Sequence, residues 1–248
     1  MALILNIDTA VDAASVCVAE DGKILSLEKN VRKDSFGERP KDHAAWLHVA
    51  IKEIFEKNNS ELKAVDAIAV TGGPGSYTGL RIGMATAKGI CYALTKPLIT
   101  LNTLQVMANA AKNVRKDSPK VTKDSFGESF VIFGEKADLL CPMIDARRME
   151  VFAAIYSKDL QIIKEPAAIE INEKSFDEEL ATRSICFFGN GSIKFQLIKK
   201  NKNAVFSSII SDASSMISLS EKKFKLNEFA DLAYVEPLYL KEFHTPAK

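Results

Sequence analysis

Apolar and polar residues follow one another along this chain in a pattern that predicts strands first, and then helices that alternate with strands. Residues 2–8 are nearly all apolar, which is typical of a central strand, and Asp21-Gly22 is a hairpin-turn signal. In its first half the pattern predicts strands at 2–8, 14–20, 23–27, 66–71 and 98–101, and helices at 42–57, 78–94 and 103–112. This order describes a mixed sheet covered by helices, so the expected fold class is α/β.

The second half of the chain repeats this pattern more weakly. It predicts strands at 141–146, 151–156 and 185–188, and helices near 192–200 and 213–224. Two short segments match between the halves, Ile7-Asp8-Thr9-Ala10 and Ile144-Asp145-Ala146-Arg147. In each, an aspartate ends an apolar strand and precedes a turn into a second strand. This match suggests a duplicated fold.

Composition narrows the class of protein. The chain has 248 residues, 47% hydrophobic and 26% charged, and contains no apolar run near the ~20 residues of a membrane span. It enters a strand at once, without a leader-like segment, so we expect a cytoplasmic protein with no membrane contact. Its net charge of +1 gives no general attraction to nucleic acid. A partner would have to supply most of the basic surface for any RNA.

Cysteines and histidines give no sign of a metal site. Cys17, Cys91, Cys141 and Cys186 lie far apart in apolar stretches, which indicates buried free thiols. Three histidines are present, His43, His48 and His244. His43 and His48 stand five positions apart on one predicted helix, whereas two imidazoles that share a metal need a spacing of three or four. We therefore expect neither a metal nor a catalytic residue.

The segment from Thr71 to Arg81 (TGGPGSYTGLR) joins a predicted strand to a helix. Backbone N–H groups at such a junction can hold an anion, although no Gly-Lys-Ser/Thr sequence ends the segment. Alternatively, the glycines permit a tight turn and Thr78 caps the helix. On the residues alone the second interpretation is favoured. Asp8 and Asp145 can likewise position a metal-bound phosphate or cap backbone N–H groups.

The helix after this segment suggests contact with other helices. From Leu80 to Leu94 its only charged residues are Arg81 and Lys88, and small residues are scattered around it. A helix that is apolar on nearly every side must be covered on more than one face. The predicted helix 42–57 is its natural neighbour, with Trp46 as an anchor. Burial within one chain and burial between subunits both stay open.

Four parts of the chain together match a known family pattern, in the same order. They are Leu5-Asn6-Ile7-Asp8-Thr9-Ala10, Gly72 to Gly83, Ile144-Asp145-Ala146-Arg147-Arg148 with Glu150-Val151-Phe152, and Glu236-Pro237-Leu238-Tyr239-Leu240. Through these segments the chain resembles the bacterial TsaB (YeaZ) family over nearly its whole length. The resemblance implies an actin-like ATPase (ASKHA) fold with two RNase H-like lobes. The first lobe would be residues 1–107, with the partner-binding helices, and the second, smaller and more degenerate, residues 108–248, whose last helix can pack back on the first lobe.

The resemblance also implies a function, that of a non-catalytic subunit in the formation of threonylcarbamoyladenosine in tRNA. Its partners would be the transferase TsaD and the ATPase TsaE; without TsaD it would form a homodimer, and it would meet tRNA only through the complex. No cofactor is expected beyond weak nucleotide binding at a vestigial phosphate loop, whose candidate residues are Asp8, Thr9, Gly73, Gly75 and Asp145. The candidate partner surface consists of His43, Trp46, Leu47, Ala50, Leu80, Gly83, Met84, Ala87, Ile90 and Cys91.

The chain departs from the family pattern at three places. The transferase relatives carry two metal-binding histidines four positions apart, whereas His43 and His48 have a different spacing. Lys241 stands where the family commonly has arginine. The segment Lys-Asp-Ser-Phe-Gly-Glu occurs twice, at 33–38 and 123–128, and Val31–Ser35 recurs at Val114–Ser118. We interpret these repeats as surface-loop insertions, in preference to the alternative of a docking peptide.

Three other functions stay open. The chain can be an ATPase or phosphotransferase of the actin-like superfamily, with Asp8, Thr9, the glycine-rich segment, Asp145 and Gly189-Asn190-Gly191 around a nucleotide. The turn at Asp8 lacks the glycine that lets phosphate approach in active members, which argues against this function. A metallopeptidase has less support, given the histidine spacing. A chaperone-like or proteolysis-regulating role through protein contacts alone is the third.

Overall fold

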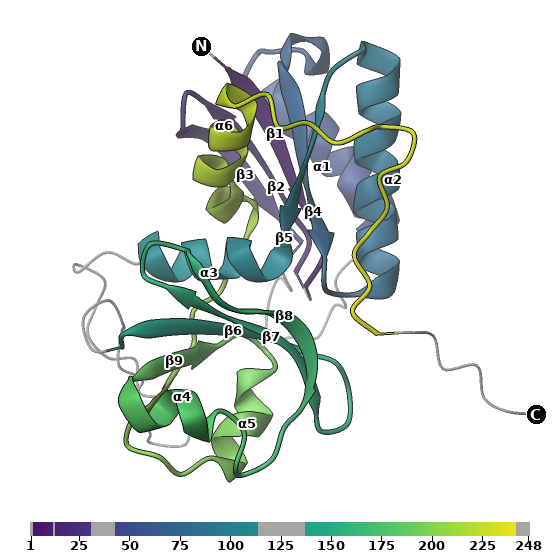
Figure 1. Cartoon of the computed structure of the whole chain (residues 1–248). Coiled ribbons are helices and arrows are strands. Elements are labelled where there is room, and N and C mark those ends of the chain that lie inside the picture. The colour runs from purple at the N-terminus through teal and green to yellow at the C-terminus, as the bar shows by residue number, and fades with distance from the viewer. Residues whose placement is uncertain (1, 12, 31–42, 114–136, 242–248) are drawn as a thin grey trace, which may run out of the picture. The chain divides into compact units, whose positions relative to one another are not determined.

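Both strand–turn–strand segments predicted from the sequence lie in five-stranded sheets, and the chain contains two such sheets (Figure 1). The computed structural model describes residues 2–11, 13–30, 43–113 and 137–241. The chain divides into two compact units. Unit 1 comprises Met1–Val106 and Ser211–Leu238, and unit 2 comprises Met107–Ile210 and Tyr239–Lys248.

The sheet of unit 1 is mixed, with the strand order β3-β2-β1-β4-β5. Its central strand, β1, pairs antiparallel with β2 and parallel with β4. The strands are β1 (Leu3–Asp8), β2 (Ser15–Glu20), β3 (Lys23–Lys29), β4 (Ala67–Gly73) and β5 (Leu98–Asn102). The helices are α1 (His43–Lys57), α2 (Tyr77–Leu94) and α6 (Ile217–Lys225), with short 3-10 helices η1 (Leu62–Ala64) and η2 (Ala213–Met216). The boundary between the two units falls within α3 (Thr103–Asn113).

The sheet of unit 2 has the same topology, with the strand order β10-β9-β6-β7-β8. Its central strand, β6, pairs antiparallel with β7 and parallel with β9, as β1 does with β2 and β4. The elements are β6 (Leu139–Asp145), β7 (Glu150–Ser157), β8 (Ile162–Glu170), α4 (Asp177–Thr182), β9 (Ile185–Phe188), α5 (Ser192–Ile198) and β10 (Ala204–Ser207). Asp8 and Asp145 therefore end equivalent strands, and the duplication expected from the sequence is confirmed.

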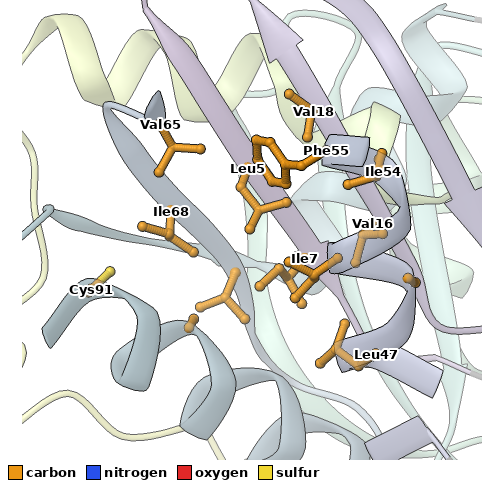
Figure 2. Close-up of a cluster of buried hydrophobic side chains, with 14 of the residues drawn as sticks. Leu5, Ile7, Val16, Val18, Leu47, Ile54, Phe55, Val65, Ile68 and Cys91 are labelled. Carbon is orange, nitrogen blue, oxygen red and sulfur yellow. The ribbon is translucent and has the colours of Figure 1, made fainter. Parts of the chain in front are cut away.

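Helices cover both faces of the unit 1 sheet because its central strands are apolar on both sides. On one face, Leu5 and Ile7 of β1 pack with residues of α1 and α2, among them Leu47 and Ile54 (Figure 2). The intervening residue Ile4 points to the opposite face, which η2 and α6 cover. This alternation is the two-residue period of a strand buried on both sides.

Aromatic rings hold the helices of unit 2 to its sheet. Phe187 of β9 is fully buried, and its ring centroid lies 5.4 Å from that of Phe176, 5.0 Å from that of Phe195 and 5.5 Å from that of Phe206. These residues come from β9, β10, α5 and the turn before α4. The contacts with Phe176 and Phe195 are edge-to-face and the contact with Phe206 is stacked, and both arrangements add to the hydrophobic contribution of the buried rings.

The strands and helices predicted for the first half are confirmed with small shifts in their ends, but their caps differ. The side chain of Ser76, not Thr78, caps α2 by accepting a hydrogen bond from the Gly79 N–H at 3.3 Å. Asn102 caps α3, because its side-chain oxygen accepts a hydrogen bond from the Gln105 N–H at 3.2 Å. In unit 2, β8, α4 and β10 were not predicted from the sequence.

All four cysteines are buried free thiols, as the sequence predicted. Along the part of the chain that the structure describes, no helix is both long and apolar enough to span a membrane. The following lie outside the described residues: residue 42, where the first predicted helix begins, the repeated segments at 31–38 and 114–128, and His244.

Candidate functional site

The glycine-rich segment after β4 is bonded directly to the turn after β1. The Thr71 hydroxyl donates to one carboxylate oxygen of Asp8 at 2.9 Å, and the Ala10 N–H donates to the same oxygen at 3.1 Å. From the loop, the Ser76 N–H donates to the Ala10 carbonyl at 2.7 Å. The Thr9 hydroxyl donates to the Gly79 carbonyl on α2 at 2.7 Å. The candidate phosphate loop is therefore tied to the chain's own backbone.

The glycines of this segment are required because the turn after β1 lies against them. An added Cβ would lie 2.3 Å from the Ala10 carbonyl oxygen at Gly75, 2.0 Å from the Thr9 carbonyl oxygen at Gly79, and 2.2 Å from the Thr9 hydroxyl oxygen at Gly83. Such distances are well below contact range. The space on the Cβ side of these glycines is therefore filled by residues 9 and 10.

Gly73 has a different neighbour, the C-terminal segment of unit 1. Its φ of 112° favours glycine, and an added Cβ would lie 2.5 Å from the Leu238 carbonyl oxygen. The Leu238 N–H donates to the Gly72 carbonyl at 2.7 Å. The Glu236–Leu240 segment that resembles the family pattern thus reaches the glycine-rich loop through Leu238. The interpretation of the glycines as packing residues accounts for all these contacts.

Asp8 is fully buried, and its second carboxylate oxygen has no hydrogen-bond partner among the described residues. Burial raises the pKa of Asp8 above its ordinary value, and the hydrogen bonds from Ala10 and Thr71 offset only part of this shift; the charge of Asp212 raises it further. A carboxyl group in this position favours its neutral form more than a solvated one does. That preference is the opposite of what a ligand for a metal–nucleotide complex needs.

We predict that the Asp8→Asn variant gains stability relative to the unchanged chain as pH rises. Because the folded-state pKa of Asp8 is raised, the native chain binds its proton more tightly, so stability from this group is present below the unfolded pKa and is lost as pH rises through the folded pKa. Asparagine stays neutral throughout. Urea denaturation between about pH 4 and about pH 7 measures this effect. The unfolding free energy of Asp8→Asn minus that of the unchanged chain should increase over this range. A constant difference would mean that Asp8 ionises as a solvated carboxylate does.

The equivalent place in unit 2 is more open to solvent. The Asp145 N–H donates to the Asn190 side-chain oxygen at 2.9 Å, and the Asp145 side chain is 43% exposed. Gly189 has a φ of 91°, and a Cβ there would lie 2.4 Å from the Met143 carbonyl oxygen. The loop after β9 therefore packs against β6 as the loop after β4 packs against β1.

The described part of the chain contains no cluster of three or more histidine, cysteine, aspartate or glutamate side chains that could hold a metal ion. His48 is exposed on α1, and the side chain of His43 is not among those described. The two histidines therefore provide no observation in favour of a peptidase-like site.

Most of the candidate partner residues lie in the core of unit 1. Seven are buried, Leu47, Ala50, Leu80, Gly83, Met84, Ala87 and Cys91. Trp46 and Ile90 are half-buried against the same core. Their role in binding a partner stays a prediction, but in this structure they pack mainly on their own sheet.

The outer faces of α1 and α2 carry residues that the sequence analysis did not single out. Val49 on α1 is 51% exposed and Tyr92 on α2 is 83% exposed. Ala85 and Gly89 are also exposed on α2, and an added Cβ at Gly89 would have no atom within 4 Å. Their spacing of four places them on one face. The sequence does show small and apolar residues along this helix, but a helix that is apolar on all sides does not reveal which of its faces points outward.

The C-terminal segment of unit 1 lies beside α2. The Lys88 ammonium donates to the Val235 carbonyl at 3.2 Å, and Ala230 pairs with Leu98 of β5. Tyr234, next to this anchor, is 83% exposed. Figure 1 shows this segment passing from α6 across the sheet to α2. It adds an exposed aromatic residue to the surface around α2.

Comparison with known proteins gives two further findings. Residues 30–123 match the family described as TsaD: tRNA N6-adenosine threonylcarbamoyltransferase. A crystal structure of a Pseudomonas aeruginosa protein, described by its similarity to the peptidase YeaZ, superposes with a TM-score of 0.77 at 22% identity, covering 97% of this chain and 100% of that one.

Two identically ordered mixed sheets, each with a strand-end aspartate packed against a glycine-containing loop, define a protein of the actin-like ATPase (ASKHA) class with RNase H-like lobes. The chain is 25% identical to TsaB of Escherichia coli over 96% of its length and 94% of that protein, and 26% identical to TsaB of Buchnera aphidicola (subspecies Baizongia pistaciae) over 96% and 98%. Over nearly its whole length, this chain is therefore similar to the TsaB (YeaZ) proteins.

Proposed function

We propose that this chain is the non-catalytic partner subunit of a complex that forms threonylcarbamoyladenosine in tRNA, where it binds a TsaD-type transferase and works with a TsaE-type ATPase. Its TsaB relatives are named for the biosynthesis of this nucleoside. Such a role belongs in the cytoplasm. The tRNA would be held by the complex as a whole, consistent with a net charge of only +1 on this chain.

The observation that carries this proposal is the outer face of α2. Arg81 is its only exposed charged residue, whereas Ala85, Gly89 and Tyr92 are exposed and small or apolar. Open space beside Gly89 allows the backbone of another helix to approach closely. An exposed face of this kind favours an interface, and aromatic residues such as Tyr92 are enriched in interfaces. Without the transferase, the same face favours self-association into a homodimer.

The closed loop in unit 1 supports the absence of catalysis by this chain alone. A phosphotransferase must hold phosphate and metal beside an ionised carboxylate. Here residues 9 and 10 fill the space beside Gly75 and Gly79, and Asp8 is fully buried. Magnesium-dependent ATP hydrolysis by the purified chain, lost in Asp8→Asn, would instead support the phosphotransferase alternative.

We predict that Gly89→Leu and Ala85→Leu each weaken binding to the TsaD homologue of the same organism by about 30-fold or more, the effect of losing a central interface contact. Co-purification and titration calorimetry measure this. The variants should keep their fold, since both positions are exposed in the single chain. Gly83→Leu and Ala87→Leu cannot test the interface, because these residues are buried and the larger side chains would disrupt the core of unit 1.

Ala181→Leu is the matched control, because it adds the same bulk at an exposed helical position in unit 2. It should bind the transferase as the unchanged chain does. Size-exclusion chromatography of the chain alone should show a dimer that Gly89→Leu converts to a monomer. Full binding by the Gly89→Leu and Ala85→Leu variants would exclude the outer face of α2 as the interface.

A further inference from the structure

The turn between β6 and β7 holds two arginines in an unusual backbone conformation. Arg147 has a φ of 69° and Arg148 a φ of 48°, both in the left-handed region that favours glycine and asparagine. Both residues are exposed. Side chains with a Cβ raise the free energy of a turn at such positions, and residues retained in this conformation often have a functional role.

The acidic groups of this turn are already paired with lysines. The Lys194 ammonium donates to an Asp145 carboxylate oxygen at 3.1 Å, to the Arg148 carbonyl at 2.8 Å and to the Glu150 carbonyl at 2.6 Å. Its side chain is only 16% exposed. Lys241 forms an ion pair with Glu150. The two lysines thus neutralise Asp145 and Glu150 and hold the turn in place.

Within the described ranges, neither the Arg147 nor the Arg148 guanidinium makes an ion pair or a hydrogen bond, so the turn between β6 and β7 presents two unpaired cationic side chains. Lys194 comes from α5 and Lys241 from the C-terminal segment, and each is paired with one of the two acids that flank the turn. Glu170, opposite Glu150 on β8, is a third acidic residue near the turn. The two arginines therefore form a small, local positive surface in a chain whose net charge is +1.

We infer that Arg147 and Arg148 contact phosphate groups of the RNA backbone, so that this chain makes one direct contact with the tRNA. This inference rests on the proposed function, which supplies the RNA. Guanidinium groups bind phosphate through paired hydrogen bonds, and a contact of this kind needs only a few residues. An acidic protein surface is the other possible ligand, but a stable protein interface buries about 800 Å² on each partner, more than a turn of this size offers.

The test compares tRNA binding by the assembled complex of this chain and the transferase homologue, across a series of salt concentrations. In the variant R147N/R148G, both residues suit the left-handed backbone but carry no charge. We expect tRNA binding about tenfold weaker at low salt, and a slope of log K against log salt that is smaller by about 1–2. The Tm of the variant should rise by about 2–4 °C, because the backbone conformation becomes favourable.

Two further variants keep the inference open to refutation. R147K/R148K preserves both charges and should retain the slope. K200N/K202N removes two exposed lysines that precede β10. Because β10, β9 and β6 are parallel, these lysines lie at the end of the sheet where the three strands begin, whereas Asp145 lies where β6 ends. This variant should leave the slope nearly unchanged. An unchanged slope in R147N/R148G, or an equal loss in K200N/K202N, would overturn the inference.

Failure of the proposed function gives a different result from failure of this inference. If R147N/R148G weakens assembly with the transferase homologue, but the complex that forms at high protein concentration keeps the salt slope for tRNA, the arginines bind a protein and the inference is wrong. If the unchanged chain does not assemble with the transferase homologue, the proposed function fails. The same slope comparison on the chain alone then decides whether the arginines contact RNA.

Discussion

Replacing Gly79 with alanine is expected to lower the free energy of unfolding of this chain by about 2–3 kcal/mol, the cost of overpacking a rigid contact. The added Cβ would lie 2.0 Å from the Thr9 carbonyl oxygen, which is backbone and has little freedom to move. The displacement would also strain the hydrogen bond from the Thr9 hydroxyl to the Gly79 carbonyl, now 2.7 Å. Urea denaturation followed by circular dichroism measures the change.

Gly89→Ala on the same helix is the matched control. Because no atom lies within 4 Å of the added methyl group, only helix propensity changes, and stability should rise by about 0.5–1 kcal/mol. Opposite signs for the two glycines would support the close packing of the turn after β1 against α2. A neutral Gly79→Ala would show that this turn moves readily and that the candidate phosphate loop can open.

Phe187→Ala is expected to destabilise unit 2 by about 3–5 kcal/mol, the range for removing a buried aromatic ring. Phe187 is fully buried, and three other rings pack around it with centroids 5.0–5.5 Å away. Its removal leaves a cavity at the contact of β9 with α5. Thermal unfolding should show a lower transition for unit 2, and limited proteolysis should cleave residues 107–210 sooner.

Leu197→Ala removes a comparable apolar side chain from the outer face of α5, where it is 78% exposed. Such a surface change should alter stability by less than about 0.5 kcal/mol. If Phe187→Ala is no more destabilising than Leu197→Ala, the aromatic cluster is not the core of this unit.

The order of strands and helices in the first half of the chain follows from local patterns. The apolar run of β1 and the Asp21-Gly22 turn are sufficient to predict the antiparallel start of the sheet, and Asp21 and Gly22 do adopt positive φ values of 47° and 77°. The matching aspartates, Asp8 and Asp145, indicated the duplication because each stands at the end of an equivalent central strand.

The closed state of the candidate phosphate loop could not be predicted in this way. The Thr9 hydroxyl meets Gly79 across 70 positions of sequence, and local rules describe only neighbours in the chain. The same limit applies to α2. Gly83 and Gly89 look alike in an apolar helix, yet Gly83 faces Thr9 and Gly89 faces open space.

Elements of unit 2 were missed for different physical reasons. β8 has no buried residue, so it lacks apolar alternation, and Pro166 within it argues against a strand except at the edge of a sheet, which is where β8 lies. α4 has only six residues and follows Phe176, whose φ of 64° is not a usual helix start, without a side-chain cap. Neither element carries the signal by which sequence patterns are recognised.

The chain returns to unit 1 after completing unit 2, and this has a consequence for its synthesis. The residues of η2 and α6 that cover Ile4, Cys17 and Ile99 lie beyond residue 210. When the first sheet leaves the ribosome, one of its faces is therefore bare, and it stays so until more than a hundred further residues have been translated. The second sheet and its helices α4 and α5 are all translated before η2 and α6 can cover this face of the first sheet. The nascent chain thus covers its first sheet last, and during that interval the apolar face of this sheet is open to aggregation.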